Sequence, residues 1–225
     1  MTINRALVTV LAFILASVGT PGSAQPSQPG PERWEADVRA FEEADRKAPA
    51  PEGAVLFVGS SSIRMWDTLQ RDFPDVRLVQ RGFGGSTLAD VLFYADRIIL
   101  PYRPRMVVVY AGDNDLAAGK TPETVFADYK ALVRKIRRAL PRTRIDFIAI
   151  KPSLARWKLI ASIRKANALI EEHASRHRRL RYVDVLTPML GRDGTPRKEL
   201  FLEDGLHLNA RGYALWKDVL APTLR

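Results

Sequence analysis

Five short apolar runs, separated by longer stretches with helical periodicity, constrain the fold of this chain more than any other feature. The runs cover residues 54–58, 76–80, 106–110, 145–150 and 181–186. Four of them are nearly continuous instead of alternating with polar residues, which is typical of strands covered on both faces. Five buried strands of this kind favour a parallel sheet.

Apolar residues recur at helical spacing in the intervals between these runs. One helical stripe begins after Thr87, and a second begins at Thr121-Pro122, a capping residue followed by proline at the first helical position. Further helices are expected over 32–47, over about 157–177 and after Asn209. Strands that alternate with helices connect through right-handed crossovers. The sequence therefore predicts an α/β fold, a three-layer α/β/α sandwich with a five-stranded parallel sheet.

The N-terminal segment has the pattern of a secretory signal. Arg5 is followed by an apolar stretch over 6–18 and by the small residues Gly22-Ser23-Ala24. So short a stretch does not comfortably span ~30 Å of hydrocarbon, which disfavours a membrane anchor. We expect a cleaved signal peptide over 1–24, a linker over 25–31 and a single domain over 32–225. The mature protein would then be periplasmic or secreted.

Composition limits the classes of partner. The net charge is +10, and the basic residues concentrate within 130–144 and 176–181. Nucleic-acid binding is one interpretation, but solvated helix faces, or attraction to anionic envelope polymers and lipids, fit an exported protein better. We expect no nucleic-acid partner and no stable membrane insertion after signal cleavage. The sequence has no cysteine, so its domain is stabilised without disulfides.

Polar segments follow the apolar runs, at the edge of a parallel sheet where ligands bind. They are 59–62, 81–87, 111–115 and 151–153, and residues 204–207 lie just before the last helix. Each segment alone could be a helix cap, a tight turn or an Asx turn. Together they offer a hydroxyl nucleophile, a histidine base, a carboxylate and amide donors. These are the groups required for acyl transfer through a serine.

Four of these segments resemble the sequence blocks of the GDSL/SGNH lipase-acylhydrolase superfamily. "FVGSSSIRMW" is similar to the first block, "RGFGGST" to the second, "AGDND" to the Gly-x-Asn-Asp of the third, and "DGLHLNARGYALW" to the Asp-x-x-His of the fifth. The resemblance extends from about residue 54 to the C-terminus. It implies a flavodoxin-like SGNH hydrolase fold and a serine esterase without a cofactor, acting on a small-molecule, lipid or carbohydrate ester.

The first block departs from the family at Ser60, where aspartate is usual, and at Ser62, where an apolar residue is usual. Alignment on the glycine and tryptophan of the block places the family's nucleophile at Ser61. A position at the turn into a helix agrees, because the N–H of Ser61 is then among the unpaired helix donors. The resemblance assigns His207 as the base and Asp204 as the carboxylate that orients it.

The resemblance also implies an oxyanion hole formed by the N–H groups of Ser61 and Gly85 and by the side-chain amide of Asn114. Residues close to the ends of the predicted strands are candidate substrate contacts. They are Phe83, Lys151, Arg156 and Leu206.

Two other functions and a metal site are alternatives to this interpretation. The same triad could transfer acyl groups to a sugar, or the Gly-Ser-Ser-Ser turn could bind an anion without turnover. An anion-binding module would not need Asp204 and His207. The pair His173 and His177 has helical i, i+4 spacing, but it lacks a neighbouring glutamate and an acidic third ligand. We therefore expect no metal.

Overall fold

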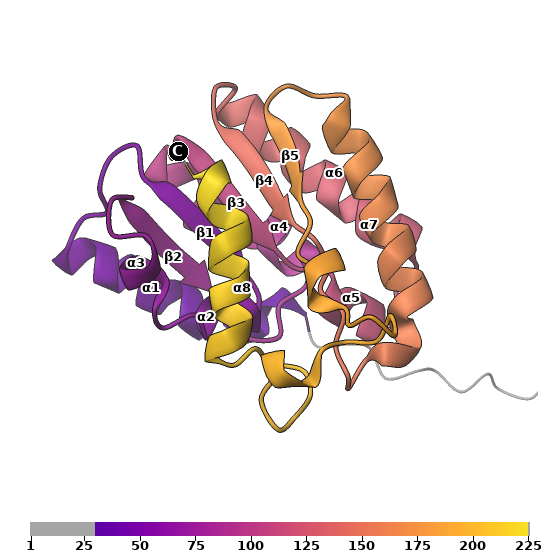
Figure 1. The fold of residues 1–225 in the computed structure, drawn as a ribbon. Coiled ribbons are helices and arrows are strands. Elements are labelled where there is room, and N and C mark those ends of the chain that lie inside the picture. Colours follow the sequence, from indigo (N-terminus) through magenta and orange to yellow (C-terminus); the bar gives the residue numbers. More distant parts are fainter. Residues whose placement is uncertain (1–29, 225) are drawn as a thin grey trace, which may run out of the picture. The chain divides into compact units, whose positions relative to one another are not determined.

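The structure is a computed structural model, and it describes residues 30–224. Its five strands form one all-parallel sheet in the order β2-β1-β3-β4-β5 (Figure 1). The strands are β1 (Val55–Gly59), β2 (Leu78–Gly82), β3 (Met106–Tyr110), β4 (Arg144–Ile148) and β5 (Leu180–Val183). The predicted α/β fold with a five-stranded parallel sheet is thus confirmed. The predicted signal peptide and most of the predicted linker lie outside the described residues.

Three helices begin at the capping residues that the sequence predicts. Thr87 forms a capping box with Asp90, Thr121 caps a helix that starts with proline, and Asn209 caps the last long helix. The α-helices are α1 (Glu35–Lys47), α2 (Ser61–Arg64), α3 (Leu69–Asp72), α4 (Leu88–Ile98), α5 (Asp113–Ala117), α6 (Pro122–Ala139), α7 (Ile160–Ser175) and α8 (Ala210–Leu220). Among residues 30–224, no helix is both long enough and apolar enough to cross a bilayer.

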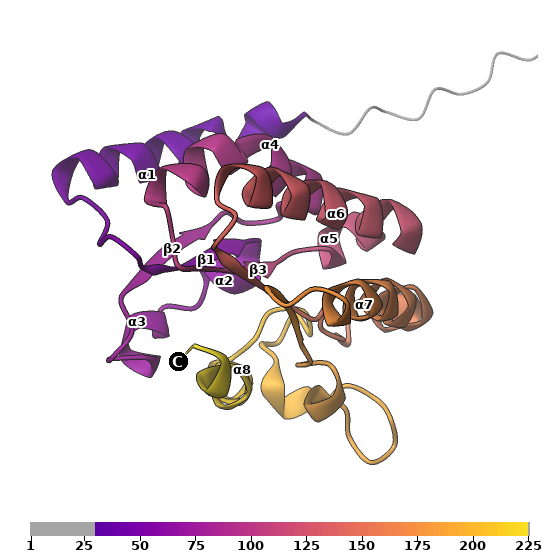
Figure 2. The same ribbon diagram turned by 90° about the horizontal axis from the view of Figure 1, so that it is seen from above.

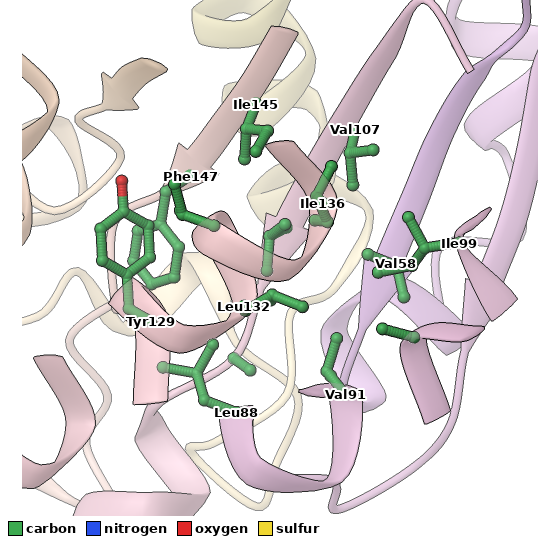
Figure 3. Packing of buried hydrophobic residues seen from close by; sticks show 14 of the residues in the cluster. Val58, Leu88, Val91, Ile99, Val107, Tyr129, Leu132, Ile136, Ile145 and Phe147 are labelled. Atoms are coloured by element: carbon green, nitrogen blue, oxygen red, sulfur yellow. The ribbon is translucent and has the colours of Figure 1, made fainter. Parts of the chain in front are cut away.

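Two hydrophobic cores lie on opposite faces of the sheet. Helices α1, α4 and α6 lie on one side, and α3 and α8 lie on the other (Figure 2). Successive strand residues point to opposite faces, so Leu56 and Val58 join the first core and Val55 and Phe57 join the second. In the first core, side chains of α4 and α6 such as Leu132 pack onto the strands (Figure 3). Both faces of the sheet are therefore buried, as the near-continuous apolar runs predict.

The second core joins α8 to the segment that follows β1. The Trp66 ring lies 5.2 Å from Tyr213 and 6.0 Å from Trp216, measured between ring centroids. The hydroxyl of Tyr213 also donates a hydrogen bond of 3.1 Å to the carbonyl of Ser62. These contacts hold the start of α8, and the loop just before it, beside the three serines.

Strands β2 and β5 differ most in their limits from the apolar runs that predicted them. Strand β2 continues to Gly82 through the polar pair Gln80 and Arg81. The Gln80 amide donates to backbone carbonyls of the α2 region, and Arg81 pairs with Asp45, so both polar side chains have partners inside the fold. Strand β5 ends at Val183 because the next residue, an aspartate, accepts two backbone hydrogen bonds and turns the chain.

The carboxyl ends of β1, β2 and β3 are aligned at Gly59. This residue is in register with Gly82 on one side and with Tyr110 on the other. Its φ is +140°, and a Cβ atom placed there would lie 1.8 Å from the carbonyl oxygen of Tyr110. Only glycine permits this backbone conformation together with so close an approach. The loops that carry the polar segments therefore start at one level of the sheet.

Replacing Gly59 by alanine should destabilise the fold strongly. We expect Gly59→Ala to lower the free energy of unfolding by about 3 kcal/mol or more, since backbone strain adds to a collision inside the sheet. Gly53→Ala is the matched control, because Gly53 also has positive φ (+66°) but its Cβ position is open. There the loss should be about 1 kcal/mol, from backbone strain alone. Urea unfolding measures both; equal losses would contradict the account.

Candidate active site

The three serines after β1 differ in their access to solvent. Ser60 and Ser62 are buried, whereas Ser61, the first residue of α2, is partly exposed. The Ser61 Oγ lies 3.2 Å from Nε2 of His207. The N–H of Ser61 has no carbonyl to bond within its own helix, because it opens the first turn. Of the three hydroxyls, that of Ser61 is therefore the one placed against a base.

His207 and Asp204 lie in one turn before α8. Nδ1 of His207 is 2.5 Å from Oδ2 of Asp204, and Oδ1 of Asp204 accepts the backbone N–H groups of Leu206 and His207 at 2.9 Å. The side-chain hydrogen bond from His207, with these backbone bonds, lowers the pKa of Asp204 to about 2. The aspartate is thus ionised at neutral pH and holds Nδ1 of the imidazole as the protonated nitrogen. This leaves Nε2 free to accept a proton from Ser61.

The turn that carries Asp204 and His207 is fixed from both sides. The N–H of Leu202 donates to the His207 carbonyl at 2.8 Å. The N–H of Ala155, in the loop after β4, donates to the carbonyl of Gly205 at 3.1 Å. The His207 imidazole and the Asp204 carboxylate therefore lie on a loop with a defined backbone, even though the side chain of Asp204 is 46% exposed.

Gly85 lies in the loop after β2, and Asn114 lies directly after the loop that follows β3. Gly85 has a φ of +78°, a conformation that favours glycine. Asn114 lies in the first turn of α5, and its Nδ2 donates a hydrogen bond of 3.0 Å to the carbonyl of Ser86, the residue after Gly85. This bond ties the two loops together. It uses one N–H of the Asn114 amide and leaves the second N–H for another acceptor.

Lys151 and Arg156 both contact Asp113, the residue before Asn114. The Lys151 ammonium is buried 3.4 Å from Oδ2 of Asp113, and Nη1 of Arg156 lies 2.9 Å from the same oxygen. Nη2 of Arg156 donates to Oδ1 of Asn114 at 2.9 Å. Burial lowers the pKa of Lys151, and the charge of Asp113 offsets part of this effect. The sequence alone indicates both cations as candidates, but it does not indicate that Asp113 and Asn114 are their partners.

The other candidate substrate contacts differ in position. Phe83 is fully buried, with its ring between Trp34 and Tyr94 at centroid distances of 5.9 and 6.2 Å. Leu206 is partly exposed, next to His207. Among the predicted contacts, therefore, Leu206 and the partly exposed Arg156 reach the surface, while Phe83 and the Lys151 ammonium are enclosed by the fold.

The ring of His173, in α7, and that of His177, just past the end of α7, have centroids 4.5 Å apart and planes tilted by 33°. Nδ1 of His177 is 2.8 Å from the backbone carbonyl of His173, so this nitrogen already has a hydrogen-bond partner. In the part of the chain that the structure describes, no group of three or more histidine, aspartate or glutamate side chains is arranged to hold a metal ion.

Removing the carboxylate of Asp113 should destabilise the protein in a pH-dependent way. In Asp113→Asn the buried Lys151 loses its counter-charge, which we expect to cost about 3 kcal/mol at neutral pH. Without the Asp113 charge, burial lowers the pKa of Lys151 further in the variant than in the wild type. As the pH rises, Lys151 therefore loses its proton first in the variant, and the folded variant gains stability before the wild type does. The loss should therefore shrink between about pH 7 and about pH 10, close to the unfolded pKa of lysine.

Asp146→Asn is the matched control for this experiment. Asp146 is also buried, but it is paired with Arg144, and an arginine keeps its charge throughout this pH range. The loss for Asp146→Asn should thus stay constant. Urea unfolding at both pH values gives the comparison. If the Asp113→Asn loss is equally constant, the carboxylate does not hold a titrating lysine.

Known proteins that resemble this chain share its fold. The sequence profile of the GDSL-like lipase/acylhydrolase family matches residues 58–215. No curated protein matches the sequence significantly. The solved structures that resemble the chain include a protein from Streptococcus pneumonia described as a platelet activating factor, with 22% identity and a TM-score of 0.75; the match covers 86% of this chain and 96% of that one.

Two further structures share the fold. A GDSL-like lipase from Bacteroides thetaiotaomicron has 20% identity and a TM-score of 0.71, over 84% of this chain and 97% of that one. A carbohydrate esterase family 3 protein from Talaromyces cellulolyticus has 18% identity and a TM-score of 0.60, over 76% and 95%. At these low sequence identities, the similar structures show only that the fold is shared. The family match covers the segments from β1 to α8, and the chain belongs to the GDSL-like lipase/acylhydrolase family.

Proposed function

We propose that this protein is a serine hydrolase of carboxylic esters, with Ser61 as nucleophile. The observation that carries the proposal is the hydrogen-bonded series from Ser61 through His207 to Asp204, with distances of 3.2 and 2.5 Å. Oγ of Ser61 attacks the ester carbonyl while Nε2 of His207 takes its proton. The proton then passes to the leaving alcohol, and a water molecule activated by the same nitrogen releases the acyl group. Asp204 stays ionised and stabilises the imidazolium.

The oxyanion of each tetrahedral intermediate would be bound by three N–H donors. These are the backbone N–H groups of Ser61 and Gly85 and the free N–H of the Asn114 side chain. The arrangement is supported by the hydrogen bond from Asn114 to the carbonyl of Ser86, which holds the second and third donors on adjacent loops. Donors fixed in advance stabilise the developing charge without reorganising, and this is commonly a large contribution to catalysis.

Solvent water can reach the proposed base, His207, so a sugar alcohol is not needed to accept the acyl group. The side chain of His207 is 26% exposed, so the proposed acyl-enzyme would be open to solvent on that side. This exposure supports hydrolysis over transfer to a sugar. One structurally similar protein is named a carbohydrate esterase. An acetylated sugar is therefore a useful substrate to test beside a simple aryl acetate.

We also propose that the enzyme acts outside the cytoplasm. The support is the sequence pattern of Arg5, the apolar stretch over 6–18 and the small residues that end at Ala24. Sequencing the N-terminus of the protein from the native host's envelope and medium tests this part separately from the activity.

Replacing Asp204 by asparagine should lower kcat/KM for p-nitrophenyl acetate by roughly 100- to 10,000-fold. The imidazole loses its charged partner, and with it the group that keeps Nδ1 protonated. The lowered pKa of Asp204, about 2, means that its ionised form is lost only as the pH falls below about 4. The factor should therefore be constant over the pH range in which the His207 imidazole is neutral in both enzymes, measured as pH profiles of both proteins.

Asp193→Asn serves as the control, because Asp193 likewise accepts local hydrogen bonds in an exposed turn, and these lower its pKa. Its activity should equal that of the wild type. An Asp204→Asn enzyme with wild-type kcat/KM where the imidazole is neutral would remove Asp204 from the proposed mechanism.

A further inference from the structure

We propose that Arg156 is a positioning residue of the oxyanion hole, acting through Asn114. Its guanidinium would select the one orientation of the Asn114 amide that leaves an N–H free for the substrate oxygen. This inference rests on the proposed esterase function. It gives Arg156 a role inside the site instead of a contact with the substrate.

The guanidinium of Arg156 bridges two consecutive side chains. Nη1 lies 2.9 Å from Oδ2 of Asp113, and Nη2 lies 2.9 Å from Oδ1 of Asn114. The residue comes from the loop between β4 and α7, and it reaches the first turn of α5. Two hydrogen bonds from one planar guanidinium fix both the position and the orientation of that group.

The chemistry of the partners dictates how the Asn114 amide must lie. A guanidinium only donates hydrogen bonds, and the carbonyl of Ser86 only accepts them. With Oδ1 toward Arg156 and Nδ2 toward Ser86, both bonds form. Rotating the amide by about 180° would set NH₂ against the guanidinium and oxygen against oxygen, and both bonds would be lost. Arg156 and Ser86 thus specify the same orientation from opposite ends of the amide.

Arg156 is itself held by charge. Asp113 is almost fully buried, and it faces both the Arg156 guanidinium and the buried Lys151 ammonium. A carboxylate with two cationic partners is costly to displace from such a position. The series therefore runs from Lys151 through Asp113 and Arg156 to Asn114. It extends from a buried ammonium to the amide that would contact the substrate.

The same loop also contacts the base. Ala155, which precedes Arg156, donates its N–H to the carbonyl of Gly205 at 3.1 Å, within the turn of Asp204 and His207. A Cβ atom on Gly205 would lie 3.0 Å from Cβ of Leu154, so the two loops are in close contact. One short segment, 154–156, thus joins the loop of the base to the side chain of the oxyanion hole.

A double-mutant cycle with p-nitrophenyl acetate separates positioning from substrate binding. Asn114→Ala should lower kcat by roughly 100- to 1,000-fold. Arg156→Gln should lower kcat by roughly 10- to 100-fold with KM unchanged, because a charge-assisted bond to the amide is lost. If Arg156 acts through Asn114, the double variant should be no slower than Asn114→Ala alone. The inference would be overturned if the two substitutions lowered kcat by factors that multiply in the double variant. It would also be overturned if Arg156→Gln raised KM.

Arg144→Gln is the matched control. Arg144 is also partly exposed and paired with a buried aspartate, Asp146, but it begins β4 at the opposite edge of the sheet. Its kcat should remain at the wild-type value. Thermal unfolding of every variant shows whether a loss of activity reflects a loss of folded protein.

A second readout does not depend on activity. The side-chain ¹⁵NH₂ signal of Asn114, identified by its absence in Asn114→Ala, should be sharp in the wild type, with two distinct proton shifts. In Arg156→Gln it should broaden or its two shifts should converge, while Arg144→Gln leaves it unchanged. An unchanged signal in Arg156→Gln would overturn the positioning role. A wild type without esterase activity, but with this response, would overturn the proposed function and leave the positioning of Asn114 standing.

Discussion

The close approach of Gly59 to the carbonyl of Tyr110 fixes the edge of the sheet from which the candidate site is built. Ser60 follows with its N–H bonded to that same carbonyl, at 3.0 Å, so the chain leaves β1 along β3 before it turns into α2. Ser61 is then presented at the first turn, with Ser60 and Ser62 directed into the protein. The loop after β3 starts beside it and leads to Asp113 and Asn114, the first two residues of α5. Two aligned strand ends thus set the spacing between the serine and the asparagine.

The remaining groups reach this edge through longer connections that are fixed by side-chain contacts. Tyr213 bonds to the carbonyl of Ser62 and stacks on Trp66, which places α8 and the loop before it. That loop holds His207 at hydrogen-bond distance from Ser61. The aromatic core on this face therefore has a geometric consequence, because it sets the distance between a hydroxyl on α2 and an imidazole far away in the sequence.

The sequence was sufficient for the layers of the fold and for the segments of the candidate site. Apolar runs and capping residues act locally, so strands and helix starts such as Thr87 and Asn209 could be predicted and are confirmed. The role of Ser61 as nucleophile stays a prediction, supported by its distance from His207. The bonds of Arg156 could not be predicted, because its partner Asn114 lies 42 positions away and no periodic pattern links them. The burial of Phe83 likewise depends on Trp34, which packs on it from the N-terminal end of the described chain.

Labelling the purified protein with a fluorophosphonate, followed by peptide mapping by mass spectrometry, tests the central claim most directly. The reagent requires a serine that a base has activated, and it needs no knowledge of the natural ester. The account predicts a single adduct on Ser61 in the folded wild type, and none in His207→Ala. An adduct on Ser60 or Ser62, or folded protein that does not react at all, would contradict it.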